Sequence, residues 1–511
     1  MTDEKQKEES KEPAAHKAPE GAEVKESWRG STGPAIRYTA RGAWTVLREK
    51  EKPVAEIYST SYVATAGAGR PVTFIFNGGP GAASVYLHVG AIGPRRAQFN
   101  ADGTVPPPPA ALTRNVESWL AFSDLVFVDP VGTGWSRAIP DEEAAKKAKE
   151  NGGKPSEDRG FWGLNKDLKS LGEFMSRWLS ENGRWESPVF VAGESYGGYR
   201  VAKLVRSLQE KHGIALNGAI LISPALEFAL LDSSDYDLLP WVDRLPTMAA
   251  AAAFHGKSGL FTRTTPLEKV LCEAEAFATG DFANLLAQGT SMPATRRKRI
   301  FARASKFMGL PTALIERAEG RVPLDVFARE LLRAEGKLIG RYDATITARD
   351  PFPDRNGFEG PDPTLAGIDG VFASGINKRL RGEIGVKTDR EYHLLSYDVN
   401  KGWKIDEERH ALQSQIGATD DLRYGMSLNP HMKVFITHGL YDLVTPYFAS
   451  NRIRNLMRLE GAAAANMTVE HFGGGHMFYA WEASRTAFTR TIRGFYASAL
   501  PSRKGVGKKR K

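Results

Sequence analysis

The sequence predicts an α/β fold, in which a mostly parallel central sheet is flanked by helices and interrupted by a large helical insertion. Apolar runs of strand length alternate with amphipathic helical patterns, in the order 72–76 (strand), 124–129 (strand), 164–179 (helix), 189–192 (strand), 199–209 (helix) and 216–222 (strand). The alternation stops over 226–430, which is rich in Ala, Arg and helix formers. It returns with strands at 434–437 and 467–472 and a closing helix at 483–497.

The chain length of 511 residues exceeds what one hydrophobic core usually supports, which favours a large domain with an insertion. Hydrophobic residues make up 41% and charged residues 25%, as is ordinary for a globular protein. We therefore expect five segments: a disordered charged tail (1–30), the first part of the core (31–225), a cap insertion (226–430), the second part of the core (431–500) and a basic tail (501–511).

The composition also argues against a membrane span and against nucleic acid as a partner. No run approaches the ~20 apolar residues of a membrane span, so no span is expected. The net charge of +9 is spread widely, and the basic cluster at 296–299 has no interleaved aromatic residue, which favours a solvated helix face over a nucleic-acid site. The oligomeric state is not predicted by these features.

Cys272 is the single cysteine, so no intrachain disulfide is expected. Residues 1–26 contain no apolar segment of the kind that directs secretion. Both observations predict a cytoplasmic protein, or a secreted or periplasmic one if the true start of the chain lies elsewhere.

The central motif is Gly193-Glu194-Ser195-Tyr196-Gly197, which lies between a predicted strand and a predicted helix. Small residues on either side of Ser195 allow a sharp turn that exposes the serine oxygen at the edge of the sheet. This strand, turn and helix arrangement is a nucleophile elbow and predicts an α/β-hydrolase fold.

A serine hydroxyl becomes nucleophilic when a histidine removes its proton and a carboxylate orients that histidine. In this fold the chain order is Ser, Asp or Glu, then His. Asp442 and His476 satisfy the order, and each follows a predicted strand. His438 and His471 are the alternative bases. Asp420 and Asp421 are the alternative carboxylates, in which case Asp442 would serve only as a helix cap.

The oxyanion of an acyl-transfer reaction needs backbone N–H donors. The N–H of Tyr196 follows the nucleophile and is the first candidate. The second must come from an earlier loop at the same edge, and Gly79 in the glycine-rich turn at 77–81 is our prediction, with tight packing as the alternative role of these glycines.

Taken together, the motifs resemble those of the serine carboxypeptidases. The set, in chain order, is Asn77-Gly78-Gly79-Pro80-Gly81, Asn115-x-x-Ser118-Trp119, Asp129-Pro130-Val131-Gly132-Thr133-Gly134, Gly193-Glu194-Ser195-Tyr196-Gly197-Gly198, Asp442 and Gly475-His476-Met477. The resemblance implies a peptidase that uses no metal or organic cofactor. It implies that Asn77 and a protonated Glu194 hold the C-terminal carboxylate of a peptide substrate, and that Met477 contacts the leaving residue.

The chain departs from the family pattern at three positions. Ile75 stands where the family has a tryptophan, Ala91 where many members have a second glutamate, and Ala82 where a cysteine is usual. These changes do not affect the predicted triad. They weaken the prediction that the site recognises the free C-terminus of a peptide. A serine esterase or acyltransferase and a proline-type aminopeptidase are therefore alternatives, and a non-catalytic binding protein is a third.

Overall fold

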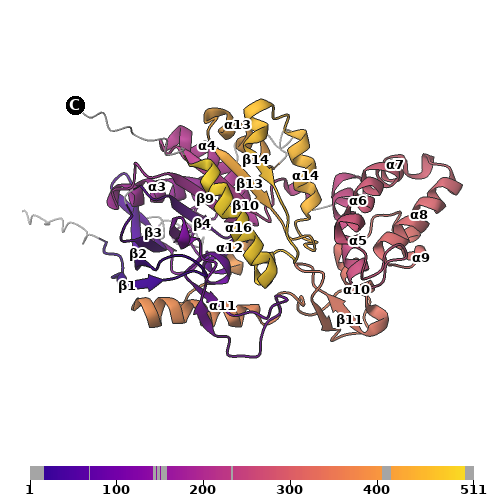
Figure 1. Ribbon diagram of the computed structural model, residues 1–511, viewed down its shortest axis with the longest axis horizontal. Coiled ribbons are helices and arrows are strands. Elements are labelled where there is room, and N and C mark those ends of the chain that lie inside the picture. The colour runs from indigo at the N-terminus through magenta and orange to yellow at the C-terminus, as the bar shows by residue number, and fades with distance from the viewer. Residues whose placement is uncertain are drawn as a thin grey trace, which may run out of the picture.

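The computed structural model describes residues 16–67, 69–141, 146, 150, 158–231, 234–405 and 416–500. Within these ranges, ten strands form one sheet, which lies in the larger, left-hand part of the molecule in Figure 1. In spatial order the strands are β1 (Ala22–Trp28), β2 (Ile36–Glu49), β3 (Lys52–Ala64), β7 (Asp124–Val128), β4 (Val72–Phe76), β9 (Val189–Glu194), β10 (Leu216–Ile222), β13 (Lys433–Thr437) and β14 (Met467–Val469), with β8 (Arg137–Ala138) paired to β3.

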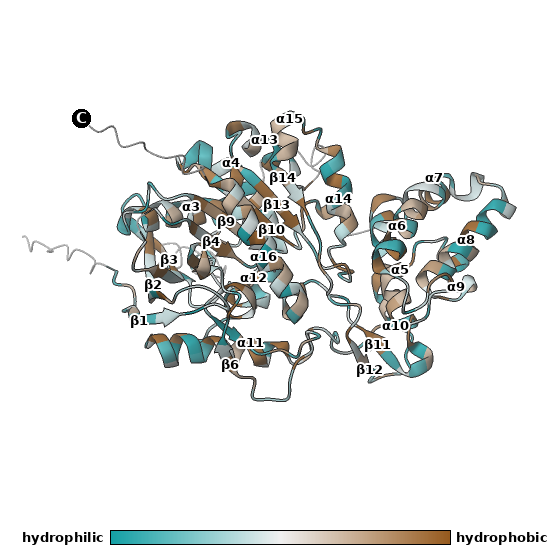
Figure 2. Cartoon of the chain, viewed as in Figure 1, coloured by the Kyte–Doolittle hydropathy of each residue, from teal (hydrophilic) through white to brown (hydrophobic). Residues whose placement is uncertain are grey.

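The strands from β7 to β14 pair in parallel, whereas β1, β2 and β3 are antiparallel. Every residue of β4, β7 and β9 is buried, as the continuous apolar runs predict for strands covered on both faces. Figure 2 shows that β9, β10 and β13 are mainly hydrophobic. The predicted α/β-hydrolase class is confirmed.

Successive residues of a strand point to opposite faces of the sheet, and both sets are mainly apolar in the central strands. Helices therefore cover both faces. In β4, Phe74 packs in the cluster with α3 (Leu164–Glu181), α4 (Tyr196–Lys211) and α13 (Thr419–Leu428). The next residue, Ile75, packs on the other face, in the cluster with α16 (Glu482–Ala499) and α11 (Ile368–Asn377). Shorter elements around this core are α1 (Val85–Leu87), β5 (Arg95–Ala97), β6 (Leu112–Arg114), α12 (Tyr397–Gly402), α14 (Tyr447–Leu456) and α15 (Gly461–Ala465).

A helical lobe stands beside the sheet, on the right in Figure 1. It consists of α5 (Leu239–Phe254), α6 (Leu267–Phe277), α7 (Ala283–Gln288), α8 (Ala294–Met308), α9 (Thr312–Arg317), α10 (Leu324–Glu330) and the hairpin β11 (Lys337–Ile339) and β12 (Thr347–Arg349). The lobe has its own hydrophobic core, in which the rings of Phe277 and Phe307 stack with centroids 4.9 Å apart.

The predicted insertion at 226–430 does not all belong to this lobe, because α11 and α13 pack on the sheet instead. Helical periodicity shows that these segments have an apolar face but not which surface that face covers. The outer limits of the insertion stay a prediction.

The predicted disordered tail at 1–30 is wrong for its last part, because residues 22–28 form the edge strand β1. Its charged composition hides an alternation in which Val24 and Trp28 face the core. The indole of Trp28 donates a hydrogen bond of 2.7 Å to the carbonyl of Asn115. Residues 1–15 and the predicted basic tail at 501–511 lie outside the described residues.

Across the described ranges, the helices are too short or too polar for any of them to traverse a lipid bilayer.

Candidate active site

Ser195 occupies the turn between β9 and α4 with φ 60° and ψ −124°, a conformation that non-glycine residues adopt rarely. The turn requires glycines around it. A Cβ atom on Gly193 would lie 2.1 Å from the carbonyl oxygen of Gly197, and one on Gly198 would lie 2.5 Å from Cβ of Pro224. The predicted elbow is therefore present, and Ser195 lies at the N-terminus of α4.

Asp442 and His476 lie together at the carboxyl edge of the sheet. Nδ1 of His476 is 2.7 Å from Oδ2 of Asp442. The buried Asp442 carboxylate also accepts hydrogen bonds from the backbone N–H groups of Val444 (2.9 Å) and Thr445 (3.0 Å), and from the Thr445 hydroxyl (2.6 Å). This carboxylate is thus held by four donors, which fixes its orientation toward the imidazole.

Burial disfavours the charged imidazolium of His476 and by itself would lower the pKa of His476. The negative charge of Asp442, the hydrogen bond to it and the nearby Glu194 outweigh burial, so the pKa of His476 lies above its ordinary value. This environment stabilises the protonated form of His476, which the predicted role as general base requires.

The alternative bases, His438 and His471, form hydrogen bonds with groups other than Asp442. Nδ1 of His438 is 2.9 Å from the Thr445 carbonyl and its Nε2 is 2.8 Å from the Ser450 hydroxyl. His471 accepts the backbone N–H of His438 at Nδ1 and contacts Asn451 through Nε2. Burial lowers the pKa of each of these two histidines to about 3, so both imidazoles are neutral at pH 7.

The alternative carboxylates are also remote from a histidine partner. Asp421 forms ion pairs with Lys203 (2.8 Å) and Arg206 (3.2 Å) on α4. Asp420 is exposed in the first turn of α13. Of the four aspartate and histidine alternatives, none reproduces the Asp442 to His476 contact.

The glycine turn after β4 lies against the elbow because β4 and β9 are neighbours, with Phe76 opposite Gly193. A Cβ atom on Gly78 would be only 2.5 Å from the backbone nitrogen of Tyr196 and 2.7 Å from the carbonyl oxygen of Glu194. Gly79 has φ +99°. The close approach brings the two predicted oxyanion donors, at Gly79 and Tyr196, to one end of the sheet, and their roles stay predictions.

Asn77 and Glu194 are adjacent because each follows directly after one member of the Phe76 and Gly193 pair. The side-chain amide of Asn77 donates to Oε2 of Glu194, and its Oδ1 accepts the backbone N–H of Leu87 at 3.0 Å. Oε1 of Glu194 has no partner with hydrogen-bond geometry among the described residues, and neither does the hydroxyl of Tyr479, which lies close enough to interact with it.

Burial raises the pKa of Glu194 to about 7, although contacts with His476, Tyr479 and Asn77 act in the opposite direction. A carboxyl group with this pKa is protonated in half of the molecules at neutral pH, so it is able to donate a hydrogen bond. Donation from this carboxyl to a substrate carboxylate stays a prediction.

Tyr479 was not singled out by the sequence, because nothing in an apolar run marks one tyrosine hydroxyl as functional. Its ring lies against Gly90, where a Cβ atom would be 3.2 Å from Tyr479 Cε2. Ala91 and Ile75, the positions that depart from the family pattern, are buried in the apolar core. Met477 follows His476 and is partly buried against the same core, and its contact with substrate stays a prediction.

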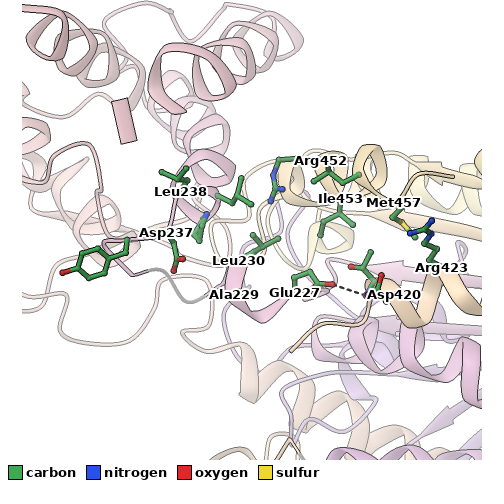
Figure 3. A pocket seen from close by; sticks show the side chains of 15 residues that line it. Glu227, Ala229, Leu230, Asp237, Leu238, Asp420, Arg423, Arg452, Ile453 and Met457 are labelled. Atoms are coloured by element: carbon green, nitrogen blue, oxygen red, sulfur yellow. Dashed lines mark hydrogen bonds between the residues drawn. The ribbon is translucent and has the colours of Figure 1, made fainter. Parts of the chain in front are cut away.

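A pocket of about 540 Å³ lies away from Ser195 and His476, where the start of the lobe meets α13 and α14 (Figure 3). Its walls include Leu230, Leu238 and Ile453, and its Arg452 is neutralised by a two-point ion pair with buried Asp243. The Ser195 elbow and His476 do not line it. Within the described ranges, no group of three side chains is arranged to hold a metal ion.

A family model described as serine carboxypeptidase matches residues 57–233 of this chain. Serine carboxypeptidase-like 46 of Arabidopsis thaliana is 26% identical over 204 residues, which cover 38% of this chain and 38% of that protein. Pheromone-processing carboxypeptidase kex1 of Aspergillus niger is 29% identical over 148 residues, which cover 28% of this chain and 20% of that protein. The chain thus matches well under half of the length of these relatives.

Among solved structures, VinJ is 12% identical with a TM-score of 0.38, and the alignment covers 90% of this chain and 99% of VinJ. The peroxisomal α/β-hydrolase Lpx1 of Saccharomyces cerevisiae is 10% identical with a TM-score of 0.37, covering 94% of this chain and 89% of that protein.

Proposed function

We propose that this chain, which is similar to the serine carboxypeptidases over residues 57–233, is a serine peptidase that removes residues from the C-terminus of peptides. In this proposal Ser195 is the nucleophile, His476 is the general base and Asp442 orients the histidine. Gly79 and Tyr196 donate backbone N–H groups to the oxyanion. Asn77 and Glu194 bind the free carboxylate of the substrate.

The reaction follows from these roles in two steps. The Ser195 oxygen forms a bond to the scissile carbonyl carbon while His476 takes the hydroxyl proton. The C–N bond then breaks, and the leaving amino acid receives that proton on its nitrogen. Water, deprotonated by His476, attacks the ester carbon, and Ser195 recovers its proton as the shortened peptide leaves.

The observation that carries carboxypeptidase specificity is the buried carboxyl of Glu194 directly before the nucleophile. Its Oε2 accepts from Asn77, its Oε1 has no contact with hydrogen-bond geometry among the described residues, and its pKa is raised to about 7. A protonated carboxyl and an amide N–H at one site are matched to a carboxylate with two acceptor oxygens. A site for a free amino group would instead need ionised acidic groups.

The test offers four matched substrates: a peptide with a free C-terminus, its C-terminal amide, a peptide with only a free N-terminus, and an aryl ester. Hydrolysis of the free acid at least ~10-fold faster than the amide supports the proposal, since the two differ only in the recognised carboxylate. Equal rates reject it. Preference for the ester indicates an esterase, and preference for the free N-terminus indicates an aminopeptidase.

The cellular location belongs to the proposal as well. Cys272 is a free and exposed cysteine. A single unpaired thiol suits a reducing compartment, and we propose an intracellular location on that ground.

A further inference from the structure

The segment 341–344 belongs to the turn that joins β11 and β12 of the lobe hairpin, and it contacts the loops that follow β13 and β14 of the sheet. It lies beside the loop that carries Asp442. The backbone N–H of Leu443 donates to the carbonyl of Arg341 at 3.1 Å, and the N–H of Ala344 donates to the carbonyl of Tyr441 at 3.0 Å. The residues on either side of Asp442 are therefore bonded to the main chain of the lobe segment.

The same segment also holds the loop that carries His476. The backbone N–H of His476 donates to the Tyr342 carbonyl at 2.5 Å. The backbone N–H of Gly475 donates to Oδ2 of Asp343 at 2.9 Å. The Tyr342 ring meets the His476 imidazole edge to face, with centroids 5.4 Å apart. Two consecutive residues of the lobe segment thus fix two consecutive residues of the histidine loop.

The approach of these backbones leaves no room for side chains. A Cβ atom on Gly475 would lie 2.1 Å from the carbonyl oxygen of Tyr342 and 2.4 Å from Cα of Asp343. A Cβ atom on Gly439, in the next loop along the edge, would lie 1.9 Å from the carbonyl oxygen of Gly475. Three chain segments are stacked here in direct contact, and the glycine run before His476 is what permits it.

Asp343 is the side chain at the centre of this contact, and it is buried. Its Oδ2 accepts from Gly475 and from the indole N–H of Trp481 at 3.2 Å. Its Oδ1 accepts the backbone N–H of Thr345 at 3.0 Å and the Thr345 hydroxyl at 2.6 Å. The backbone N–H of Asp343 donates to the Thr364 hydroxyl at 2.9 Å. Both carboxylate oxygens are saturated with donors, so the carboxylate has one orientation.

We propose that Asp343 is a positioning residue for the catalytic histidine: it anchors the backbone before His476 to the helical lobe and so sets the imidazole against Asp442 and Ser195. This inference rests on the proposed function, because it assigns a role within the same triad. It makes the lobe part of the catalytic apparatus, since the turn of the lobe hairpin contacts both loops.

The substitution Asp343→Asn tests this role with little change in volume. Asparagine has one acceptor oxygen, so its NH₂ group must face one pair of donors, either those from Gly475 and Trp481 or those from Thr345. If the NH₂ group faces Gly475, the loop that carries His476 loses this hydrogen bond. If the NH₂ group faces Thr345, the segment 341–344 loses the bonds that hold the Asp343 side chain in place. We expect kcat to fall by ~10- to 100-fold with KM within ~3-fold, because misplacement of a reacting group by a fraction of an ångström affects the chemical step.

Thr345→Ala is the matched control, because it removes a donor to the same carboxylate but leaves the contact with Gly475. It should keep kcat within ~3-fold of the parent value. Gly475→Ala perturbs the contact from the opposite side and should lower kcat in the same way as Asp343→Asn. Near-ultraviolet circular dichroism gives the folded fraction of each variant, so that rates are compared per folded molecule.

Labelling of Ser195 by a fluorophosphonate separates this inference from the proposed function, because it requires the activated serine but no peptide specificity. A parent protein that is labelled, with Asp343→Asn and Gly475→Ala labelled at least ~10-fold more slowly, supports the inference. Folded Asp343→Asn with a labelling rate and kcat within ~3-fold of the parent overturns it. A parent protein that is never labelled overturns the serine mechanism and this role with it.

Discussion

Oε2 of Glu194 accepts a hydrogen bond from the side-chain amide of Asn77, while Oε1 of the same carboxyl has no contact with hydrogen-bond geometry among the described residues and lies near the Tyr479 hydroxyl. In the proposed function the contact with Asn77 orients the carboxyl group, which then donates to the substrate carboxylate. Because burial raises the pKa of Glu194 to about 7, the protonated form that donates a hydrogen bond is present below pH 7 and is lost as the pH rises above it.

The first prediction concerns pH dependence. For a free-acid peptide, kcat/KM of the parent enzyme should decline above pH 7 and be ~100-fold below its plateau at pH 9, since an acid of pKa 7 is about 99% ionised there. Glu194→Gln should abolish this decline, because the glutamine NH₂ donates at every pH while its oxygen still accepts from Asn77. The measurement is kcat/KM from pH 5 to pH 9.

The C-terminal amide of the same peptide is the control substrate, because it has no carboxylate for Glu194 to bind. Its profile should lack the decline above pH 7 in both proteins. Persistence of the decline in Glu194→Gln would show that another group is responsible.

The second prediction concerns Tyr479, whose hydroxyl interacts with Glu194 and lowers its pKa. Removing this hydroxyl in Tyr479→Phe should raise the pKa of Glu194, so the decline in kcat/KM for the free acid should move to higher pH. Tyr424→Phe, on the exposed surface of α13, is the control and should leave the profile unchanged. An unshifted profile in Tyr479→Phe would exclude an electrostatic role of this hydroxyl.

The third prediction concerns the orientation of His476. In Asp442→Asn the side-chain NH₂ would face Nδ1 of the imidazole, which stabilises the tautomer that is protonated at Nε2 and cannot act as a base. We expect kcat on an aryl ester to fall by ~10⁴-fold without loss of fold. Asp420→Asn changes the exposed alternative carboxylate and should retain full activity. A decrease of less than ~10-fold in Asp442→Asn would contradict the assignment.

The central strands and the contact between Asp442 and His476 could be predicted from the sequence because the signals for them are local. The apolar run at 72–76 ends in a glycine turn, and the run at 216–222 has the bounds of β10. Asp442 and His476 each follow a strand, and parallel strands bring their following residues to one edge. Burial and hydrogen bonding then place the two side chains in contact, as predicted.

The contacts of Tyr479 with Glu194 and of Asp343 with Gly475 could not be predicted, because they join segments far apart in the chain. Asp343 reaches Gly475 across 132 positions. The edge strand β1 was missed for a different reason. Three of its seven residues are charged, and its inward-facing Glu26 has no apolar character. A pattern based on hydropathy does not detect a strand that is held by an ion pair.

The fourth prediction concerns this ion pair. Glu26 accepts from the fully buried Arg379 at 2.9 and 2.6 Å and from the Tyr38 hydroxyl at 2.5 Å. Arg379 also contacts Glu383 at 2.8 Å. Glu26→Gln should lower the free energy of unfolding by ~1–3 kcal/mol at pH 7, because a buried guanidinium loses one of its two carboxylate partners.

The same pair predicts how the loss depends on pH. Burial acts to raise the pKa of Glu26, but its contacts with Arg379 outweigh burial, so the pKa in the folded state is below its ordinary value. The stabilisation is therefore complete above the unfolded-state pKa and is lost as the pH falls through the folded-state pKa. The difference in Tm between the parent protein and Glu26→Gln should shrink in acid. Glu23→Gln, exposed on the same strand, should leave Tm unchanged at either pH, and an equal effect of the two substitutions would exclude the ion pair as the cause.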